Sequence, residues 1–147
     1  MSKNILLINP WIYDFAAYDF WLKPLGLLYL GGLLRANNHR ISYIDCLDPH
    51  SALMSEKSGK TPRRHKYGHG RFFRQGIDKP DCLQFMPRNY CRYGIDPDVF
   101  RTELSLYPET DLVLVTSMMT YWYPGVFDAI RIIRETLPGI PIVLGGK

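Results

Sequence analysis

The sequence of 147 residues lacks the features of a membrane or secreted protein. No apolar run reaches the ~18 residues that span a bilayer, and the longest candidate, residues 24–34, contains three glycines. The N-terminus enters a strand-like run without the cleavage pattern of a secretory signal. We therefore expect a cytoplasmic protein that has no membrane partner.

Cysteine is scarce, and its spacing does not suggest a metal site. Cys46, Cys82 and Cys91 are separated by 35 and 8 residues, which matches no common zinc or iron–sulfur pattern. Three cysteines cannot all pair with one another, so we expect free thiols in a reducing compartment and no metal ligands.

Acidic residues are nearly absent from one long stretch. Between Lys57 and Arg92 the sequence has ten Lys and Arg but only Asp78 and Asp81, a net charge of +8 in a chain of net charge +4. Such a stretch attracts anions, whether phosphate groups or nucleic acid. Its cations share no helical face, however, which favours a solvated basic surface.

Segments typical of strands and helices alternate along the rest of the chain. Continuous apolar runs predict buried parallel strands at residues 5–8 and 111–116, and further strands are predicted at residues 41–45 and 140–144. Helices are predicted at residues 24–36, 97–107 and 124–137, each with a proline at its start. This order predicts an α/β protein with a flavodoxin-like (Rossmann-like), doubly wound parallel sheet.

The first predicted helix is apolar around most of its circumference. Leu25, Tyr29 and Leu33 share one face, and further leucines lie elsewhere. A helix of this composition is expected to be deeply buried, and Gly31-Gly32 would let it lie close to a strand.

Residues 46–95 show no periodicity and are predicted to form a long irregular insertion that is basic and rich in aromatic residues. We expect its aromatic side chains to order it: Tyr67, Phe72, Phe73, Phe85, Tyr90 and Tyr93.

We take residues 1–147 as a single domain. Doubly wound domains normally have five strands or more, so the four predicted here indicate a sheet that is incomplete at the C-terminus, a truncated chain and marginal stability.

Ligands of open α/β sheets bind beyond the carboxyl ends of the strands. Three loops lie there, and their hydroxyl, apolar and glycine residues are our candidate cofactor-binding set: Asn9, Pro10, Trp11, Ser117, Met118, Thr120, Gly145 and Gly146. Each has an alternative role, because hydroxyls also cap helices, glycines also turn the chain and aromatic side chains also cover a core. No catalytic residue is predicted.

Five segments together resemble one known kind of domain. They are residues 3–10 (KNILLINP), 24–30 (PLGLLYL), 44–45 (ID), 111–120 (DLVLVTSMMT) and 141–146 (PIVLGG). Their order is similar to that of the cobalamin (B12)-binding-type domain that precedes the radical S-adenosylmethionine (SAM) domain in B12-dependent radical SAM proteins. Residues 68–73 (GHGRFF) are also similar to a stretch of that subgroup.

The resemblance implies a flavodoxin-like sheet that holds cobalamin at its carboxyl edge, with the nucleotide tail near Ser117, Thr120 and Gly145-Gly146. The loop after the first strand lacks the histidine of the Asp-x-His-x-x-Gly signature. We therefore expect cobalamin without a protein histidine ligand.

The implied function is a cobalamin-binding module that is not catalytic by itself and serves methyl transfer or other radical chemistry in a parent enzyme. Its partners would be cobalamin and the radical SAM domain of the same parent chain. This chain lacks the Cys-x-x-x-Cys-x-x-Cys motif, so the 4Fe-4S cluster and S-adenosylmethionine would belong to a C-terminal part beyond it.

Two alternatives stay open. One is a flavodoxin-like domain that binds a nucleotide or flavin, although neither G-x-G-x-x-G nor G-x-x-x-x-G-K-[ST] follows the first strand. The other is a non-catalytic interaction or nucleic-acid-binding domain that uses the basic insertion. We rank nucleic acid below cobalamin as a partner.

Overall fold

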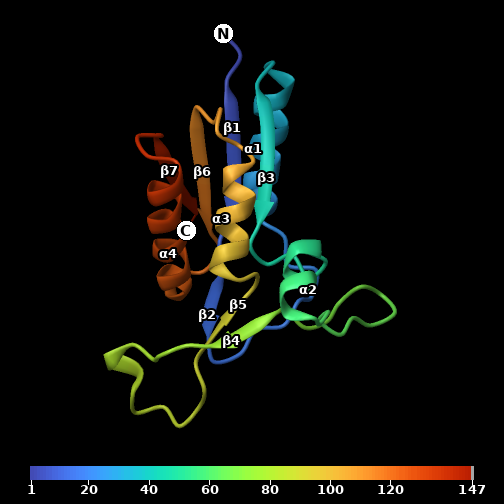
Figure 1. Ribbon diagram of the computed structural model, residues 1–147, viewed down its shortest axis with the longest axis vertical. Coiled ribbons are helices and arrows are strands. Elements are labelled where there is room, and N and C mark those ends of the chain that lie inside the picture. The colour runs from blue at the N-terminus through green and yellow to red at the C-terminus, as the bar shows by residue number, and fades with distance from the viewer. Residues whose placement is uncertain (147) are drawn as a thin grey trace.

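Four parallel strands form the main sheet of the computed structural model, which describes residues 1–146 (Figure 1). Lys147, the last residue of the predicted domain, lies outside the described residues. In spatial order the strands are β3 (Arg40–Asp45), β1 (Asn4–Asn9), β6 (Leu112–Ser117) and β7 (Ile142–Gly146). The predicted α/β class and all four predicted strands are thus confirmed.

Helices cover the two faces of this sheet unequally. On one face lie α3 (Pro97–Ser105) and α4 (Tyr123–Thr136), whereas α1 (Leu25–Ala36) lies on the other (Figure 1). Alternate residues of the central strands enter two cores, as the two-residue period of a strand requires. Leu6 and Val113 pack towards α3 and α4, and Leu7 packs towards α1.

The helices begin where the prolines predict. Asp96 is the N-cap of α3 and accepts a hydrogen bond from the backbone N–H of Asp98 at 2.9 Å, with Pro97 in the first turn. Pro124 lies in the first turn of α4, and Pro24 immediately precedes α1. None of the helices within residues 1–146 is long and apolar enough to span a membrane.

The predicted deep burial of α1 is wrong. Only Leu27 and Gly31 of this helix are buried, and Leu25 and Tyr29 are 75% and 73% exposed. The helix packs on one side against β1, β3 and β6, so its other side faces outward. The predicted close approach of the helix to a strand occurs at Gly31, where a Cβ would lie 2.5 Å from Cδ1 of Leu7, and not at Gly32, where a Cβ would have no atom within 4 Å.

The insertion is not irregular throughout. It contains α2 (Ala52–Ser58), a 3-10 turn η1 (Asp81–Leu83), and the strands β4 (Arg74–Gly76) and β5 (Cys91–Tyr93). Both strands join β2 (Ile12–Asp14) in a small antiparallel sheet of order β2-β5-β4. This sheet lies at the carboxyl end of β1, at the bottom of Figure 1.

Aromatic side chains order the insertion only in part. Phe72, Phe73, Tyr90 and Tyr93 are buried as predicted, but Tyr67 and Phe85 are exposed. The three cysteines are free, with Cys46 and Cys91 buried and Cys82 exposed.

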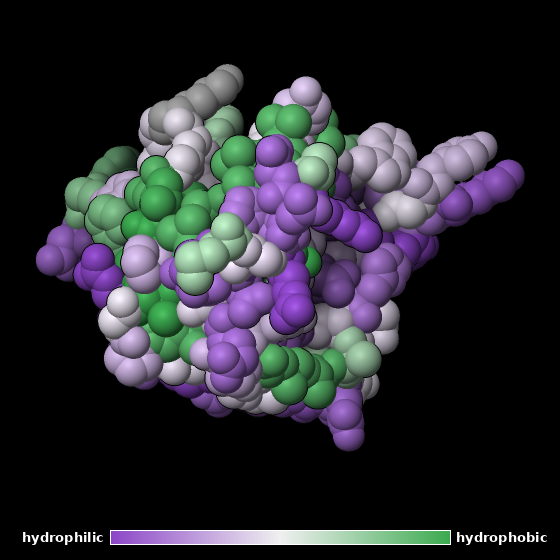
Figure 2. Space-filling view, turned by 90° about the horizontal axis from the view of Figure 1, so that it is seen from above, coloured by the Kyte–Doolittle hydropathy of each residue, from purple (hydrophilic) through white to green (hydrophobic). Residues whose placement is uncertain are grey.

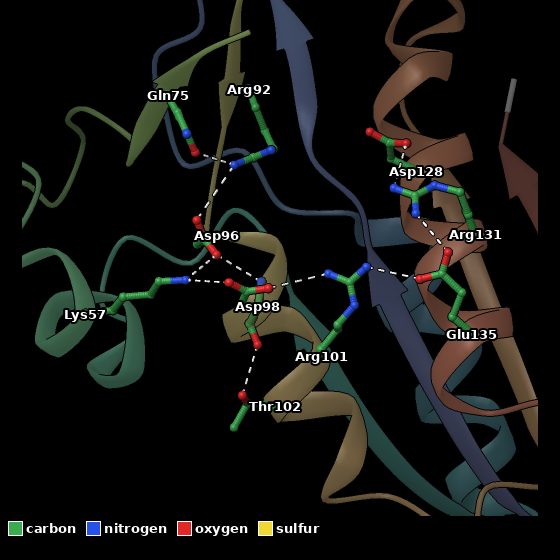
Figure 3. A network of polar contacts seen from close by, with 10 residues as sticks. All are labelled: Lys57, Gln75, Arg92, Asp96, Asp98, Arg101, Thr102, Asp128, Arg131 and Glu135. Atoms are coloured by element: carbon green, nitrogen blue, oxygen red, sulfur yellow. Dashed lines mark hydrogen bonds and ion pairs between the residues drawn. The ribbon is translucent and has the colours of Figure 1, made fainter.

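A chain of charged side chains links the insertion to the helices of the main sheet (Figure 3). Lys57 of α2 donates to Asp96 at 2.6 Å and to Asp98 at 3.0 Å. The chain continues through α3 into α4 along Arg101, Glu135, Arg131 and Asp128. Because these pairs are largely exposed, each contributes little stability on its own.

The surface is uneven when viewed from the end at which the N-terminus lies. Hydrophobic surface gathers mainly in the left half of Figure 2, which is the side of α4 and β7 in Figure 1. Hydrophilic surface dominates the right half, on the side of α2.

Candidate functional site

The carboxyl end of β1 is covered by the insertion. Asn9, Pro10 and Trp11 are all buried, and the exposed fraction of Trp11 is 1%. The indole N–H of Trp11 donates to the carbonyl of Ile95 at 2.7 Å, and its ring meets the edge of Phe100 with centroids 5.1 Å apart. In this structure these three predicted site residues lie in the interior, where Trp11 serves the core.

Two glycines make room for Trp11. A Cβ on Gly94 would lie 2.2 Å from the carbonyl oxygen of Cys46 and 2.8 Å from Cδ1 of Trp11, and the φ of Gly94 is +122°. A Cβ on Gly125 would lie 2.5 Å from the carbonyl oxygen of Trp11. Segments far apart in the sequence therefore enclose the indole, which local sequence patterns do not reveal.

A polar cluster closes the ends of β1 and β3. The carboxylate of Asp45 accepts from Nδ2 of Asn9 at 2.8 Å, and its other oxygen pairs with Lys23 at 2.8 Å. The side chain of Asp45 is only 8% exposed. Burial raises the pKa of the neighbouring Tyr43, and Asp45 adds to that shift. Both oxygens of Asp45 accept hydrogen bonds, and one of the donors, Lys23, lies in the loop before α1. The cluster therefore holds this loop against the ends of β1 and β3.

The ends of β6 and β7 remain accessible. Beside them a slot of about 260 Å³ lies between α1 and the sheet. We call it the α1 slot, and its lining consists of glycines, aliphatic side chains and one threonine: Gly26, Leu27, Leu30, Leu114, Val115, Thr116, Val143, Gly145 and Gly146.

The two glycines of β7 shape the α1 slot differently. A Cβ on Gly145 would have no atom within 4 Å, so the space beside it is open. Gly146 has a φ of +133°, and a Cβ there would lie 2.1 Å from the carbonyl oxygen of Ser117. Glycine is thus required at 146 by backbone geometry, whereas at 145 it keeps the slot unfilled.

The other predicted residues lie beside the α1 slot and not in its lining. Ser117 pairs with Gly146 across the sheet, and its hydroxyl donates to the carbonyl of Met119 at 3.3 Å. Met118 packs against the apolar cluster of the small sheet. Thr120 is exposed at the start of a 3-10 turn, η2 (Thr120–Trp122).

The sequence prediction missed Thr116 and the α1 residues that line the slot. A signal for Thr116 existed, because it follows Leu114 by two residues and must share its face of the sheet. Gly26 offered a weaker signal as a glycine in the first turn of a helix. Leu27 and Leu30 could not be distinguished from the other leucines of α1.

In the part of the chain that the structure describes, no histidine lines the α1 slot. His65 and His69 stack with ring centroids 4.8 Å apart in a loop beside Trp21, and His39 accepts a hydrogen bond from the backbone of Lys3 at the other end of the sheet. No three His, Cys, Asp or Glu side chains within residues 1–146 are grouped to hold a metal ion. The slot therefore offers a ligand apolar contact, backbone groups and one hydroxyl.

Comparisons of the chain with protein-family models, with curated proteins and with solved structures gave no match.

Proposed function

We propose that this chain is a cobalamin-binding module and that the α1 slot takes the nucleotide tail of the cofactor. The observation that carries the proposal is the Gly145-Gly146 end of β7, which lies beside an open, apolar slot at the carboxyl edge of a parallel sheet. Ligands of this fold class bind at that edge. The aliphatic walls suit the flat, largely apolar base of the tail.

The strand order supports a flavodoxin-like topology. In sequence order the main-sheet strands are first β1, second β3, third β6 and fourth β7, so their spatial order is 2-1-3-4. This matches the first four positions of the flavodoxin-like order 2-1-3-4-5. The order reverses between β1 and β6, and β6 lines the α1 slot.

The residues of this chain would bind and orient the cofactor and not perform chemistry. Leu27, Leu114 and Val143 would exclude water from the tail. Bound cobalamin would supply methyl transfer or other radical chemistry. The 4Fe-4S cluster and S-adenosylmethionine would come from the radical SAM domain of a parent protein, since this chain has no Cys-x-x-x-Cys-x-x-Cys motif.

The α1 slot favours cobalamin over a nucleotide or flavin. Among residues 1–146, no charged side chain lines it that could hold a phosphate. A free nucleotide or flavin mononucleotide ends in a phosphate monoester, which would lose its strongest recognition without cations or a glycine-rich loop. The phosphate of the cobalamin tail is a diester with a single charge, and it would lie outside the slot when the base enters. Flavin mononucleotide is therefore the competing ligand in the test.

The test is a titration of the folded chain with hydroxocobalamin, followed by its visible spectrum. We expect a saturable spectral change that Gly145→Val weakens by roughly tenfold or more, because the new side chain fills the slot. The matched control is Gly76→Val, also a strand glycine with no atom within 4 Å of an added Cβ. Binding of flavin mononucleotide and not cobalamin, or equal effects of the two variants, would overturn the proposal.

A further inference from the structure

A second pocket lies against the small antiparallel sheet, on residues that the proposed function does not use. Its volume is about 670 Å³, within the roughly 300–1,000 Å³ of pockets that bind small molecules. We call it the β4–β5 pocket, and it is lined by Phe15, Arg74, Gly76, Ile77, Asp78, Lys79, Arg88, Asn89, Tyr90, Cys91 and Tyr93.

The walls of the β4–β5 pocket are held in place by hydrogen bonds. The hydroxyl of Tyr90 donates to the carbonyl of Tyr13 at 3.1 Å, and the backbone N–H of Ile77 donates to the carbonyl of Tyr90 at 3.0 Å. The ammonium of Lys79 donates to the carbonyl of Met86 at 2.6 Å and so ties the β4–β5 connection to itself. The pocket is built before any ligand arrives.

Positive charge dominates this pocket. Three cations, Arg74, Lys79 and Arg88, line it together with one carboxylate, Asp78. Arg74 and Arg88 are exposed and form no ion pair with any of residues 1–146. An arginine presents a planar fork of donors that matches the oxygens of a phosphate. Two such forks on one pocket suit a phosphate ester.

The remaining lining suits a ring and a sugar. Phe15 is partly exposed and is held edge-on against Tyr90, with ring centroids 5.2 Å apart. It offers an aromatic surface next to the cations, on which a base can stack. The carboxylate of Asp78 can accept from a sugar hydroxyl, and the amide of Asn89 can pair with a base edge. Inorganic phosphate, which has no base or sugar, would not use Phe15, Asp78 or Asn89.

We propose that the β4–β5 pocket binds a nucleotide, with its phosphate on Arg74 and Arg88 and its base against Phe15. The nucleotide can be free or can be part of a single-stranded nucleic acid, since both present the same groups. The α1 slot plays no part in this binding. Either site can therefore fail its test without affecting the other.

The test measures binding of adenosine monophosphate to the purified chain by calorimetry at low ionic strength. We expect Arg74→Gln and Arg88→Gln each to weaken binding by about tenfold or more, because each removes a charge-assisted hydrogen bond. The matched control is Arg71→Gln. Arg71 is also an exposed arginine of the insertion without an ion pair among the described residues, but it does not line the pocket.

Further ligands separate the sources and the competing explanation. Adenosine and inorganic phosphate should each bind more weakly than the nucleotide. A single-stranded oligonucleotide that binds more tightly, and that loses affinity with Arg74→Gln but not Arg71→Gln, supports the pocket and identifies the polymer as its source. Equal losses for all three arginine variants, or no saturable binding of the nucleotide at millimolar concentration, overturn the proposal. Circular dichroism confirms that each variant is folded.

Discussion

The α1 slot is walled by leucines, valines, glycines and one threonine, whereas the β4–β5 pocket is walled by two arginines, a lysine and tyrosines. The slot lies between α1 and the strands β6 and β7, whose lining residues are mainly aliphatic or glycine, so its walls are apolar. The pocket belongs to short strands in a basic insertion, and few acidic side chains neutralise its cations there. Affinity should therefore come from apolar burial in the slot and from charge in the pocket.

The two regions meet at Trp11, and this junction gives the largest predicted effect. Trp11→Ala should lower the free energy of unfolding by about 3–5 kcal/mol, because it empties a fully enclosed site between the main core and the insertion. Urea unfolding measures the loss. Trp21→Ala is the control, since Trp21 is largely exposed. If Trp11→Ala left stability unchanged, the indole would not be a core residue, and its role as a ligand surface would have to be reconsidered.

Salt should separate the two candidate sites. Raising the ionic strength should weaken nucleotide binding in the β4–β5 pocket several-fold, because salt screens the attraction of exposed arginines for phosphate. Cobalamin binding in the α1 slot should change little, since the described residues that line it carry no charged side chain. Calorimetry and the visible spectrum give the two affinities. Equal salt dependence would show that the two sites do not differ in the way proposed.

The ion network between the regions should contribute a smaller, pH-dependent term. Burial raises the pKa of Asp96, but hydrogen bonds from Lys57 and from the backbone of Asp98 outweigh it and hold the pKa below its usual value. The carboxylate therefore stabilises the fold above the unfolded pKa of about 3.9, and this contribution disappears as the pH falls through the lower folded pKa.

Asp96→Asn keeps an N-cap side chain but removes the charge. We expect it to cost up to about 1 kcal/mol at neutral pH, because the pair is partly exposed, and nothing below the folded pKa of Asp96. Asp98→Asn, at a side chain that is 75% exposed, should cost less. Thermal unfolding from pH 7 down to pH 2 tests both, and a penalty that persists at the acid end would contradict the assignment.

The two sides of α1 give the smallest predicted effects. Gly32→Ala should raise the free energy of unfolding by about 0.5–1 kcal/mol, because its Cβ would meet no atom and alanine favours a helix. Gly31→Ala should not raise the free energy of unfolding, since its Cβ would lie only 2.5 Å from Cδ1 of Leu7. Urea unfolding of the pair checks this, and equal gains would show that α1 lies further from β1.

Local patterns predicted the main sheet but not the insertion, for a physical reason. The central strands β1 and β6 of the main sheet are largely buried and appear as apolar runs. Asp96-Pro97 marks a helix start without reference to anything distant. The small sheet joins residues 12–14, 74–76 and 91–93. Three-residue strands are too short to show a period, and their pairing depends on contacts far apart in the sequence.

The candidate site was predicted in part for the same reason. The Gly145-Gly146 end of β7 follows an obvious strand, and the structure places both glycines in the α1 slot. An aromatic residue in a loop can cover a core or meet a ligand, and only the packing of Gly94 and Gly125 around Trp11 distinguishes these roles. The exposed face of α1 was missed because composition cannot say which of its sides has a neighbour.

Binding of the nucleotide tail is tested by comparing hydroxocobalamin with cobinamide, which has the corrin ring but lacks the tail. If the α1 slot takes the tail, the chain binds hydroxocobalamin at least several-fold more tightly, and Gly145→Val removes this preference while Gly76→Val keeps it. Equal affinity for the two corrinoids, or binding of neither, would contradict binding of the tail in the α1 slot.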